Sequence, residues 1–410
     1  MHGAGHPVRW QVGLRRVRRD GHRFLPDADG AAHVLGQVDP RRRREPVQKA
    51  QGTTGHGAAQ GNGVGNRAMS GHRKSLAWRG MAEWVMRFVV FGAGAVGGLV
   101  GARLFQQGFD VTLVARGAHA AALAAGLVLE APDENVTLPV PVVTDPSEVR
   151  WSEDTIVLLG VKGQDTEHAL EQLLAVALPS TPIVCMQNGV ENERRVLRRF
   201  PATYAMCVMC PATHLRPGVI QAHSAPISGL LDLGRYPAGV DDTAQGIADA
   251  LDSTAFGSVA RSDIMRWKYR KLLMNLLNAV EALCGPEART SPLAREAQHE
   301  GEDALAAAGI AVASKEEDRA RRADHLQMRN TESGQWSGGS SWQSLARGTG
   351  SIEAEFLNGE VVLLGALHGV PTPVNALLQH MAVQAALEGR PPASWSIEQL
   401  TEMAGVPLGA

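Results

Sequence analysis

One segment near residue 90 limits the possible folds more than any other part of the chain. Residues 87–91 form a short apolar, β-prone run, and a G-x-G-x-x-G turn follows them directly at 92–97. The next residues keep helical spacing until Gly108, and 110–115 again has the composition of a strand. A β-α-β unit of about 30 residues with this turn is typical of dinucleotide-binding domains. The alternative is a structural turn in an α/β domain that binds no nucleotide.

Each glycine of this turn has its own physical task. Gly92 permits a tight turn out of the strand, Gly94 lets the backbone approach a pyrophosphate, and Gly97 lets the helix lie close to the sheet. The free N–H groups at the start of the helix then face the phosphates. We therefore predict that the cofactor is bound by Gly92, Ala93, Gly94, Ala95, Val96 and Gly97.

The end of the second strand predicts which dinucleotide is bound. An NAD enzyme usually has Asp or Glu there to bind the ribose 2′-OH. Here the chain continues with Arg116 and, three residues later, His119. The guanidinium of Arg116 suits a 2′-phosphate, so we predict NADPH/NADP+ as the cofactor. The alternatives are a solvated Arg116 and, for His119, an ordinary surface side chain.

Two further apolar runs, 155–161 and 182–186, are typical of buried parallel strands. Lys162 follows the first run, and Asn188 lies just beyond the second. Because ligands of open parallel sheets bind beyond the carboxyl ends of the strands, both side chains are predicted to face the cofactor or the substrate. Both could equally belong to ordinary loops, since Asn-Gly is a common turn dipeptide.

From Ser262 onward the pattern becomes helical, and 264–280 is predicted to be one long helix. Lys271, Asn275 and Asn278 are spaced i, i+4 and i+7, which places them on one face. Polar groups in an otherwise apolar helix need partners when they are buried, and a substrate carboxylate or carbonyl would supply them. The alternative is a solvated stripe on an amphipathic helix.

Two further segments carry candidate residues. Ser340 lies in a small-residue loop, where it could also cap a short helix, and Glu353 lies in a helix predicted over about 352–368. Cys207 and Cys210 lie inside an apolar run and are predicted to be core thiols, because no second pair stands nearby. No metal site is predicted.

Length and charge limit the class of protein. A chain of 410 residues suggests two or three domains, and a net charge of −2 gives no general field for nucleic acid. No apolar window is long enough to span a membrane. Four cysteines exclude a disulfide scaffold, and we expect a cytoplasmic protein.

The first 85 residues differ from the rest. They carry 13 Arg and 2 Lys against 6 acidic residues, without a helical or strand period. A basic nucleic-acid arm and a transit peptide are possible interpretations. We favour a disordered or non-native upstream extension over 1–85, with translation starting at Met81 or Met86.

Taken together, these segments resemble ketopantoate reductase (2-dehydropantoate 2-reductase). They follow in the family's order over about residues 86–390, and the matching pieces are the glycine turn at 92–97, Lys162, 187–189, 270–275, 340–341 and 353–359. The resemblance implies an α/β fold of the 6-phosphogluconate-dehydrogenase-like type. An NADP-binding Rossmann domain with a mostly parallel sheet is expected over 86–255, and an all-helical substrate and catalytic domain over 256–395.

The resemblance also implies an activity, which is NADPH-dependent reduction of 2-dehydropantoate to (R)-pantoate in pantothenate and coenzyme A biosynthesis. Carried over by position, Lys271 donates a proton to the ketone oxygen, and Glu353 holds the substrate hydroxyl and helps to orient Lys271. Asn275 and Ser340 bind substrate polar groups, and Asn188 contacts both cofactor and substrate. A small 2-oxo acid is the expected partner, and a homodimer is possible.

The sequence departs from the family pattern around the expected substrate pocket. Residues 342–345 and 353–355 differ from the usual motifs, and 285–289 lacks a substrate-binding Asn that family members carry. These differences leave open a reductase of another 2-oxo acid on the same scaffold. A non-enzymatic NADP-binding regulatory protein is the third alternative.

Overall fold

The computed structural model of the protein describes residues 86–323, 325–331 and 338–406. The upstream extension expected over 1–85 lies outside the described residues. The described residues all belong to one compact unit.

The centre of the fold is an eight-stranded sheet in the order β13-β12-β8-β7-β6-β1-β2-β5. Neighbouring strands are parallel throughout, except that β12 runs antiparallel to β8. Its strands are β1 (Arg87–Phe91), β2 (Asp110–Val114), β5 (Val142–Val143), β6 (Thr155–Leu159), β7 (Ile183–Cys185), β8 (Thr203–Met209), β12 (Gly229–Arg235) and β13 (Phe256–Gly257). The mostly parallel sheet predicted from the glycine turn is therefore confirmed.

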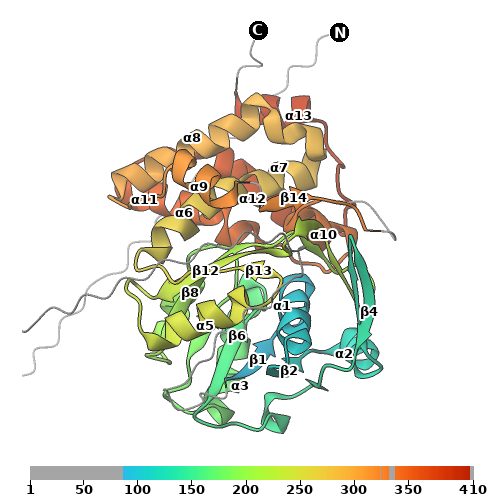
Figure 1. Cartoon of the computed structure of the whole chain (residues 1–410). Helices are drawn as coiled ribbons and strands as arrows, with labels where there is room; N and C mark the ends of the chain where they lie inside the picture. The colour runs from blue at the N-terminus through green and yellow to red at the C-terminus, as the bar shows by residue number, and fades with distance from the viewer. Residues whose placement is uncertain (1–85, 324, 332–337, 407–410) are drawn as a thin grey trace, which may run out of the picture. The chain divides into compact units, whose positions relative to one another are not determined.

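The strands are apolar because both faces of the large sheet are covered. All five residues of β6 and all seven of β8 are buried, and continuous apolar runs are typical of such strands. Figure 1 shows α1, α3 and α5 beside the strands. The helices of this half are α1 (Ala95–Gln106), α2 (Gly117–Ala124), α3 (Thr166–Val176), α4 (Asn192–Leu197) and α5 (Asp242–Asp252).

Two smaller sheets complete the strand structure. Helix α1 packs between the large sheet and a four-stranded sheet of order β4-β3-β10-β9. Those strands are β3 (Leu127–Ala131), β4 (Glu134–Leu138), β9 (Ala212–Thr213) and β10 (Val219–Ala222), and the third sheet pairs β11 (Ser224–Pro226) with β14 (Leu326–Met328).

Among the described residues, the part of the chain expected to be helical, 256–395, contains two short strands besides its helices. Helices α7, α8, α10 and α12 pack around a shared apolar core, seen from orange to red in Figure 1. The helices are α6 (Ile264–Asn275), α7 (Leu277–Cys284), α8 (Pro292–Ala307), α9 (Lys315–Arg322), α10 (Ser340–Ala346), α11 (Asn358–His368), α12 (Pro373–Leu387) and α13 (Ile397–Ala404). The expectation of an all-helical domain over 256–395 is corrected at two places: β13 (Phe256–Gly257) joins the large sheet, and β14 pairs with β11 of the sheet half.

The two long helices predicted in this half are both interrupted. The first divides into α6 and α7 at Leu276, and the second divides into a 3₁₀ turn (Glu353–Phe356) and α11 at Leu357. One buried side chain joins both breaks, because Asn358 Nδ2 donates to the Leu276 carbonyl at 3.2 Å and to Asn375 Oδ1 at 3.0 Å. In one continuous helix the Leu276 carbonyl would accept only from a backbone N–H. Here it also accepts from the side-chain amide of Asn358.

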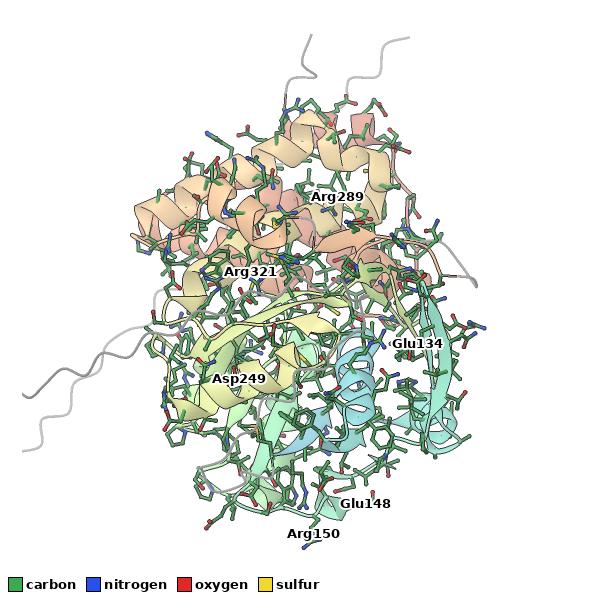
Figure 2. All side chains as sticks on the ribbon, in the orientation of Figure 1. Glu134, Glu148, Arg150, Asp249, Arg289 and Arg321 are labelled. Atoms are coloured by element: carbon green, nitrogen blue, oxygen red, sulfur yellow. The ribbon has the colours of Figure 1, made fainter. Side chains whose placement is uncertain are left out.

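Charged contacts join the helical half to the large sheet. Arg321 of α9 donates to both carboxylate oxygens of Asp232 in β12, and Figure 2 shows Arg321 beside that strand. Asp232 also accepts from Arg261 at 2.6 Å. Within the described ranges, no helix is long and apolar enough to cross a membrane.

Candidate active site

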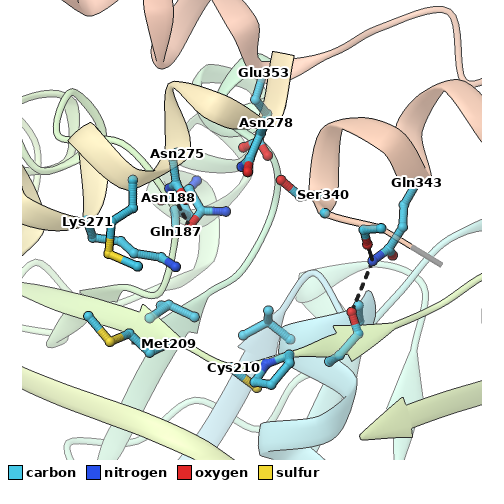
Figure 3. Close-up of a pocket in the computed structure, with 18 of the residues that line it drawn as sticks. Gln187, Asn188, Met209, Cys210, Lys271, Asn275, Asn278, Ser340, Gln343 and Glu353 are labelled. Atoms are coloured by element: carbon cyan, nitrogen blue, oxygen red, sulfur yellow. Dashed lines mark hydrogen bonds between the residues drawn. The ribbon is translucent and has the colours of Figure 1, made fainter. Parts of the chain in front are cut away.

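A cleft of about 740 Å³ lies where the carboxyl ends of the central strands face α6, α7 and α10 (Figure 3). Most of the residues selected from the sequence line it: Gly94, Ala95, Val96, Lys162, Asn188, Lys271, Asn275, Asn278, Ser340 and Glu353. The other four, Gly92, Ala93, Gly97 and Arg116, do not line it. Residues nearly 260 positions apart in the chain therefore share one cavity.

The glycine turn has the geometry that a diphosphate needs. Gly92 has a φ of +102°, and a Cβ on Gly97 would lie 2.2 Å from the Gly92 carbonyl oxygen. A Cβ on Gly94 would meet nothing within 4 Å, so this position opens into the cleft. No side chain caps the start of α1. The N–H groups of its first turn are therefore available to an anion, which fits a dinucleotide cofactor.

His119 is not the ordinary surface side chain that the sequence suggested. Its Nε2 lies 2.7 Å from the Ala93 carbonyl oxygen, and its Nδ1 accepts a hydrogen bond from the Gly218 amide at 3.0 Å. The ring contacts that of His214, with centroids 3.9 Å apart and the ring planes tilted by 40°. Burial lowers the pKa of His119. A neutral ring with its proton on Nε2 satisfies both bonds. It holds the glycine turn against the segment that contains Gly218.

Arg116 lies at the carboxyl end of β2, beside the strand that carries the glycine turn. Its side chain is 79% exposed, and one guanidinium nitrogen lies 3.2 Å from Asp165 Oδ2. An exposed ion pair of this kind contributes little to stability, so the guanidinium is available to a ligand phosphate. Its predicted contact with a 2′-phosphate stays a prediction.

Lys271 reaches the cleft from α6 as a half-buried side chain. Burial, above all, lowers the pKa of the amine from 10.5, and the like charges of Arg289 and Arg322 act in the same direction. In the described part of the chain Lys271 makes no ion pair. A partly desolvated, unpaired amine beside other cations is a group suited to meeting an anionic substrate.

Glu353 lines the same cleft as Lys271, and its described hydrogen bond is to the sheet half. Its Oε1 accepts a hydrogen bond from the Gly163 amide at 3.3 Å. Its charge acts on Lys162 and Arg347, whose pKa values burial lowers and Glu353 partly restores. Among the described contacts none joins Glu353 to Lys271, so its expected part in orienting that amine stays a prediction.

The asparagines connect the two halves of the chain across the cleft. Asn275 Nδ2 of α6 donates to Asn188 Oδ1, beyond β7, at 3.1 Å. Asn275 is 4% exposed and Asn278 is 8% exposed, which excludes a solvated stripe. Asn278 Oδ1 accepts from Arg289 at 3.3 Å. The i, i+4, i+7 spacing therefore identified a cleft-lining face, even though the helix breaks within it.

Arg289 and Glu281 belong to the cleft although the sequence did not select them. Arg289 Nη1 lies 2.6 Å from Glu281 Oε2, and Glu281 Oε1 accepts from the Gly339 amide at 3.1 Å. The available signal was that Arg289 lies in the segment 285–289, where an asparagine was expected. A cation thus lies beside Asn278, in the segment where the family resemblance implied an asparagine that this sequence lacks.

Ser340 does not cap the short helix α10. The N-cap position is occupied by Gly339 instead, and the Ser340 hydroxyl has no hydrogen-bond partner among the described residues. Figure 3 shows that hydroxyl directed toward Asn278 and Glu353. An unpartnered hydroxyl at this place is available to a ligand.

A buried ion pair positions α6, and no pattern in the sequence indicates it. Lys268 Nζ lies 2.5 Å from Glu193 Oε1 of α4, with side chains 2% and 0% exposed. The same amine donates to the Gln187 carbonyl at 3.0 Å, next to Asn188. In the sequence pattern of this helix, nothing distinguishes Lys268 from a lysine that faces solvent. The pair ties the helix that carries Lys271 to the strand end that carries Asn188.

Glu193→Ala is expected to destabilise the protein by about 3–5 kcal/mol, because it leaves the buried Lys268 charge uncompensated. The double variant Lys268→Met with Glu193→Leu should recover most of that loss, since it removes both charges. Urea unfolding measures the effect, with Glu316→Ala on the exposed face of α9 as the matched control. A loss below about 1 kcal/mol for Glu193→Ala would show that the pair is solvated.

Comparison with known proteins gives the family. The model of "Ketopantoate reductase PanE/ApbA" matches residues 88–237, and that of its C-terminal domain matches 263–385. A 2-dehydropantoate 2-reductase of Archaeoglobus fulgidus is 28% identical over 306 residues, covering 72% of this chain and 97% of the relative. Another of Pyrococcus horikoshii is 26% identical over 200 residues, 48% of this chain, and the chain spans 64% of its length.

Solved structures agree with these matches. A PanE/ApbA family ketopantoate reductase from Ralstonia eutropha JMP134 is 25% identical and superposes with a TM-score of 0.61, covering 74% of this chain and 99% of the other. A D-mandelate dehydrogenase shares the fold at 21% identity, with a TM-score of 0.63 and coverage of 74% and 99%. Both domain models, in chain order, cover the sheet half and the helical half that build the cleft. The chain therefore belongs to the ketopantoate reductase family.

Proposed function

We propose that this protein reduces 2-dehydropantoate to (R)-pantoate with NADPH. The observation that carries the proposal is the position of the Lys271 amine, which makes no ion pair among the described residues and lines the same cleft as the open glycine turn. The family match and the relatives named 2-dehydropantoate 2-reductase support the same reaction. When bound, a reduced nicotinamide supplies a hydride to the ketone carbon.

The residues of the cleft provide the other half of the chemistry. As negative charge develops on the ketone oxygen, the Lys271 ammonium stabilises it and donates a proton to it. The Asn275–Asn188 pair and the Ser340 hydroxyl offer donors and acceptors that orient the substrate's polar groups. Glu353, in the 3₁₀ turn before α11, suits the substrate hydroxyl, and Lys162, beyond β6, suits the cofactor.

The charges around Lys271 support a substrate with a single carboxylate. Lys271, Arg289 and Arg322 contribute three positive charges, whereas Glu281 and Asp318 bind the two arginines and contribute two negative charges. One positive charge stays uncompensated, which matches the one carboxylate of a simple 2-oxo acid. A second candidate function, reduction of a different 2-oxo monocarboxylic acid, is favoured by Arg289 in a segment expected to carry an asparagine.

A steady-state assay of the purified full chain tests the proposal through the loss of NADPH absorbance. Ketopantoate should give the highest kcat/KM in a panel that also contains other branched 2-oxo acids and a 2-oxo dicarboxylic acid. Higher kcat/KM for another monocarboxylic oxo acid would favour the second candidate. No turnover with any oxo acid, despite NADPH binding, would support a regulatory protein instead.

Arg116→Ala is expected to lower kcat/KM for NADPH by about tenfold to a hundredfold, the equivalent of roughly 1.5–3 kcal/mol of charge-assisted hydrogen bonding. The value for NADH should not change, because NADH has no 2′-phosphate. Arg150→Ala is the matched control, since Figure 2 shows that exposed arginine far from Arg289 and the cleft. Equal losses for both cofactors would assign Arg116 another role.

We also propose that the enzyme works in the cytoplasm and as a homodimer. All four cysteines are free thiols, as expected in a reducing compartment. Size-exclusion chromatography with light scattering tests the homodimer, and cell fractionation tests the compartment.

A further inference from the structure

One face of α10 begins and ends with residues that line the cleft, Ser340 and Arg347. Ser340, Ser344 and Arg347 are spaced i, i+4 and i+7, so they share this face, and Arg347 continues the helix at its C-cap. The span from the first to the last is about 10 Å at 1.5 Å per residue. Ser340 lies at the substrate end beside Asn278, whereas Arg347 lies at the other end.

Arg347 lies at the glycine-turn end of the cleft. Its Nη1 donates to the His214 carbonyl at 2.8 Å. The His214 ring contacts that of His119, and His119 Nε2 in turn lies 2.7 Å from the Ala93 carbonyl oxygen of the turn. Arg347, Gly94 and Ala95 all line the same cavity. This places a guanidinium of the helical half opposite the start of α1.

The charge of Arg347 has no ion-pair partner among the described residues. It is half-buried, and burial lowers its pKa. Lys162, whose amine donates to the Ser344 hydroxyl, is close enough for the two positive charges to disfavour each other. Glu353 is the carboxylate that acts on both, and it accepts its own hydrogen bond from Gly163. Two cations and the uncapped start of α1 therefore converge on one end of the cleft.

We propose that Arg347 binds the diphosphate of the nicotinamide cofactor, so that the helical half of the chain holds the cofactor against the glycine turn. This inference rests on the proposed function, because it requires a dinucleotide in the cleft. A diphosphate carries two negative charges, and this end of the cleft offers two cations, Lys162 and Arg347, against the single carboxylate of Glu353. A guanidinium can bind phosphate oxygens through two parallel hydrogen bonds. The remaining Arg347 donors satisfy this geometry while Nη1 keeps its bond to His214.

Cofactor titration of Arg347→Gln tests the assignment, with NADPH and NADH fluorescence as the readout and the full chain as the sample. Both cofactors should bind about tenfold or more weakly, and by the same factor, because both contain the diphosphate. Arg116→Ala should weaken only NADPH, so the two arginines are distinguished by the NADPH-to-NADH ratio. Arg347→Lys should recover part of the affinity, since it keeps the charge but not the two-point contact.

Arg295→Gln, which removes an exposed arginine of α8, is the matched control and should bind both cofactors like the wild type. Thermal unfolding of each variant shows whether it is folded. Unchanged cofactor affinity in a folded Arg347→Gln variant would overturn the inference, as would a loss confined to NADPH or a higher KM for the oxo acid alone. The proposed function fails separately, if wild-type protein binds NADPH but reduces no oxo acid.

Discussion

Lys271→Ala is expected to lower the kcat of ketopantoate reduction by roughly 10³-fold, because it removes both the proton donor and the positive charge that meets the new alkoxide. The amine lies in the cleft and is unpaired among the described residues, so no neighbour is positioned to replace it. The affinity for NADPH should stay within about twofold of the wild type, because the glycine turn and the Lys162–Ser344 contact are untouched. Steady-state kinetics and cofactor titration measure the two quantities.

Lys271→Arg separates charge from proton donation. Arginine keeps a positive charge but does not release its proton, so kcat should stay low. Lys315→Ala, which removes a lysine that is 66% exposed on α9, is the control and should leave kcat unchanged. A kcat of Lys271→Ala within tenfold of the wild type would mean that another group donates the proton.

The pH dependence gives a second test of the same residue. Burial lowers the pKa of the Lys271 amine below 10.5, and Arg289 and Arg322 favour the neutral form further, while Asp318 and Cys207 oppose them. Reduction needs the protonated amine, so kcat should be highest below this pKa and fall as the pH rises through it. Oxidation of pantoate needs the neutral amine and should show the opposite dependence. Both limbs should disappear in Lys271→Ala.

The fold and most of the cleft could be predicted from the sequence because their signals are local. The glycine turn at 92–97 lies within one β-α-β unit, and Lys271, Asn275 and Asn278 are spaced on one helical face. The glycine turn and the polar helix face lie far apart in the sequence. The carboxyl ends of parallel strands nevertheless meet at one edge of the sheet, and this also brings Lys162 and Asn188 together. Local pattern and sheet topology were sufficient for these residues.

The residues that the sequence did not reveal depend on partners far along the chain. Lys268 resembles any surface lysine until its partner Glu193 is brought within 2.5 Å. His119 gains its role from the Ala93 carbonyl and the Gly218 amide, which are backbone groups without a side-chain signal. Arg347 follows a helix too short to show a clear period. The helix break at Leu276 likewise depends on Asn358, more than 80 residues away.

Gly97→Ala and Gly94→Ala are expected to fail in different ways, although both add one methyl group to the same turn. The new Cβ at Gly97 would lie 2.2 Å from the Gly92 carbonyl oxygen, a backbone atom that cannot rotate away. We expect a loss of about 3 kcal/mol in the free energy of unfolding, at the upper end for overpacking. The Cβ at Gly94 meets nothing within 4 Å, so the loss there should stay below about 1 kcal/mol, the usual cost of a poorer N-cap.

The affinity for NADPH should separate the two variants in a different way from stability. Gly94→Ala, which loses little stability, should still lose affinity. Gly94 adjoins the uncapped start of α1, and a methyl group there occupies space that a diphosphate needs in order to approach the N–H groups. Gly94→Ala should therefore bind NADPH more than tenfold more weakly while keeping nearly wild-type stability, as measured by fluorescence titration and urea unfolding. A stable Gly94→Ala protein with unchanged affinity would place the cofactor away from this turn. Gly97→Ala, three residues further along the same turn, is the comparison for a general disturbance of the helix, because that disturbance would lower stability as well as affinity.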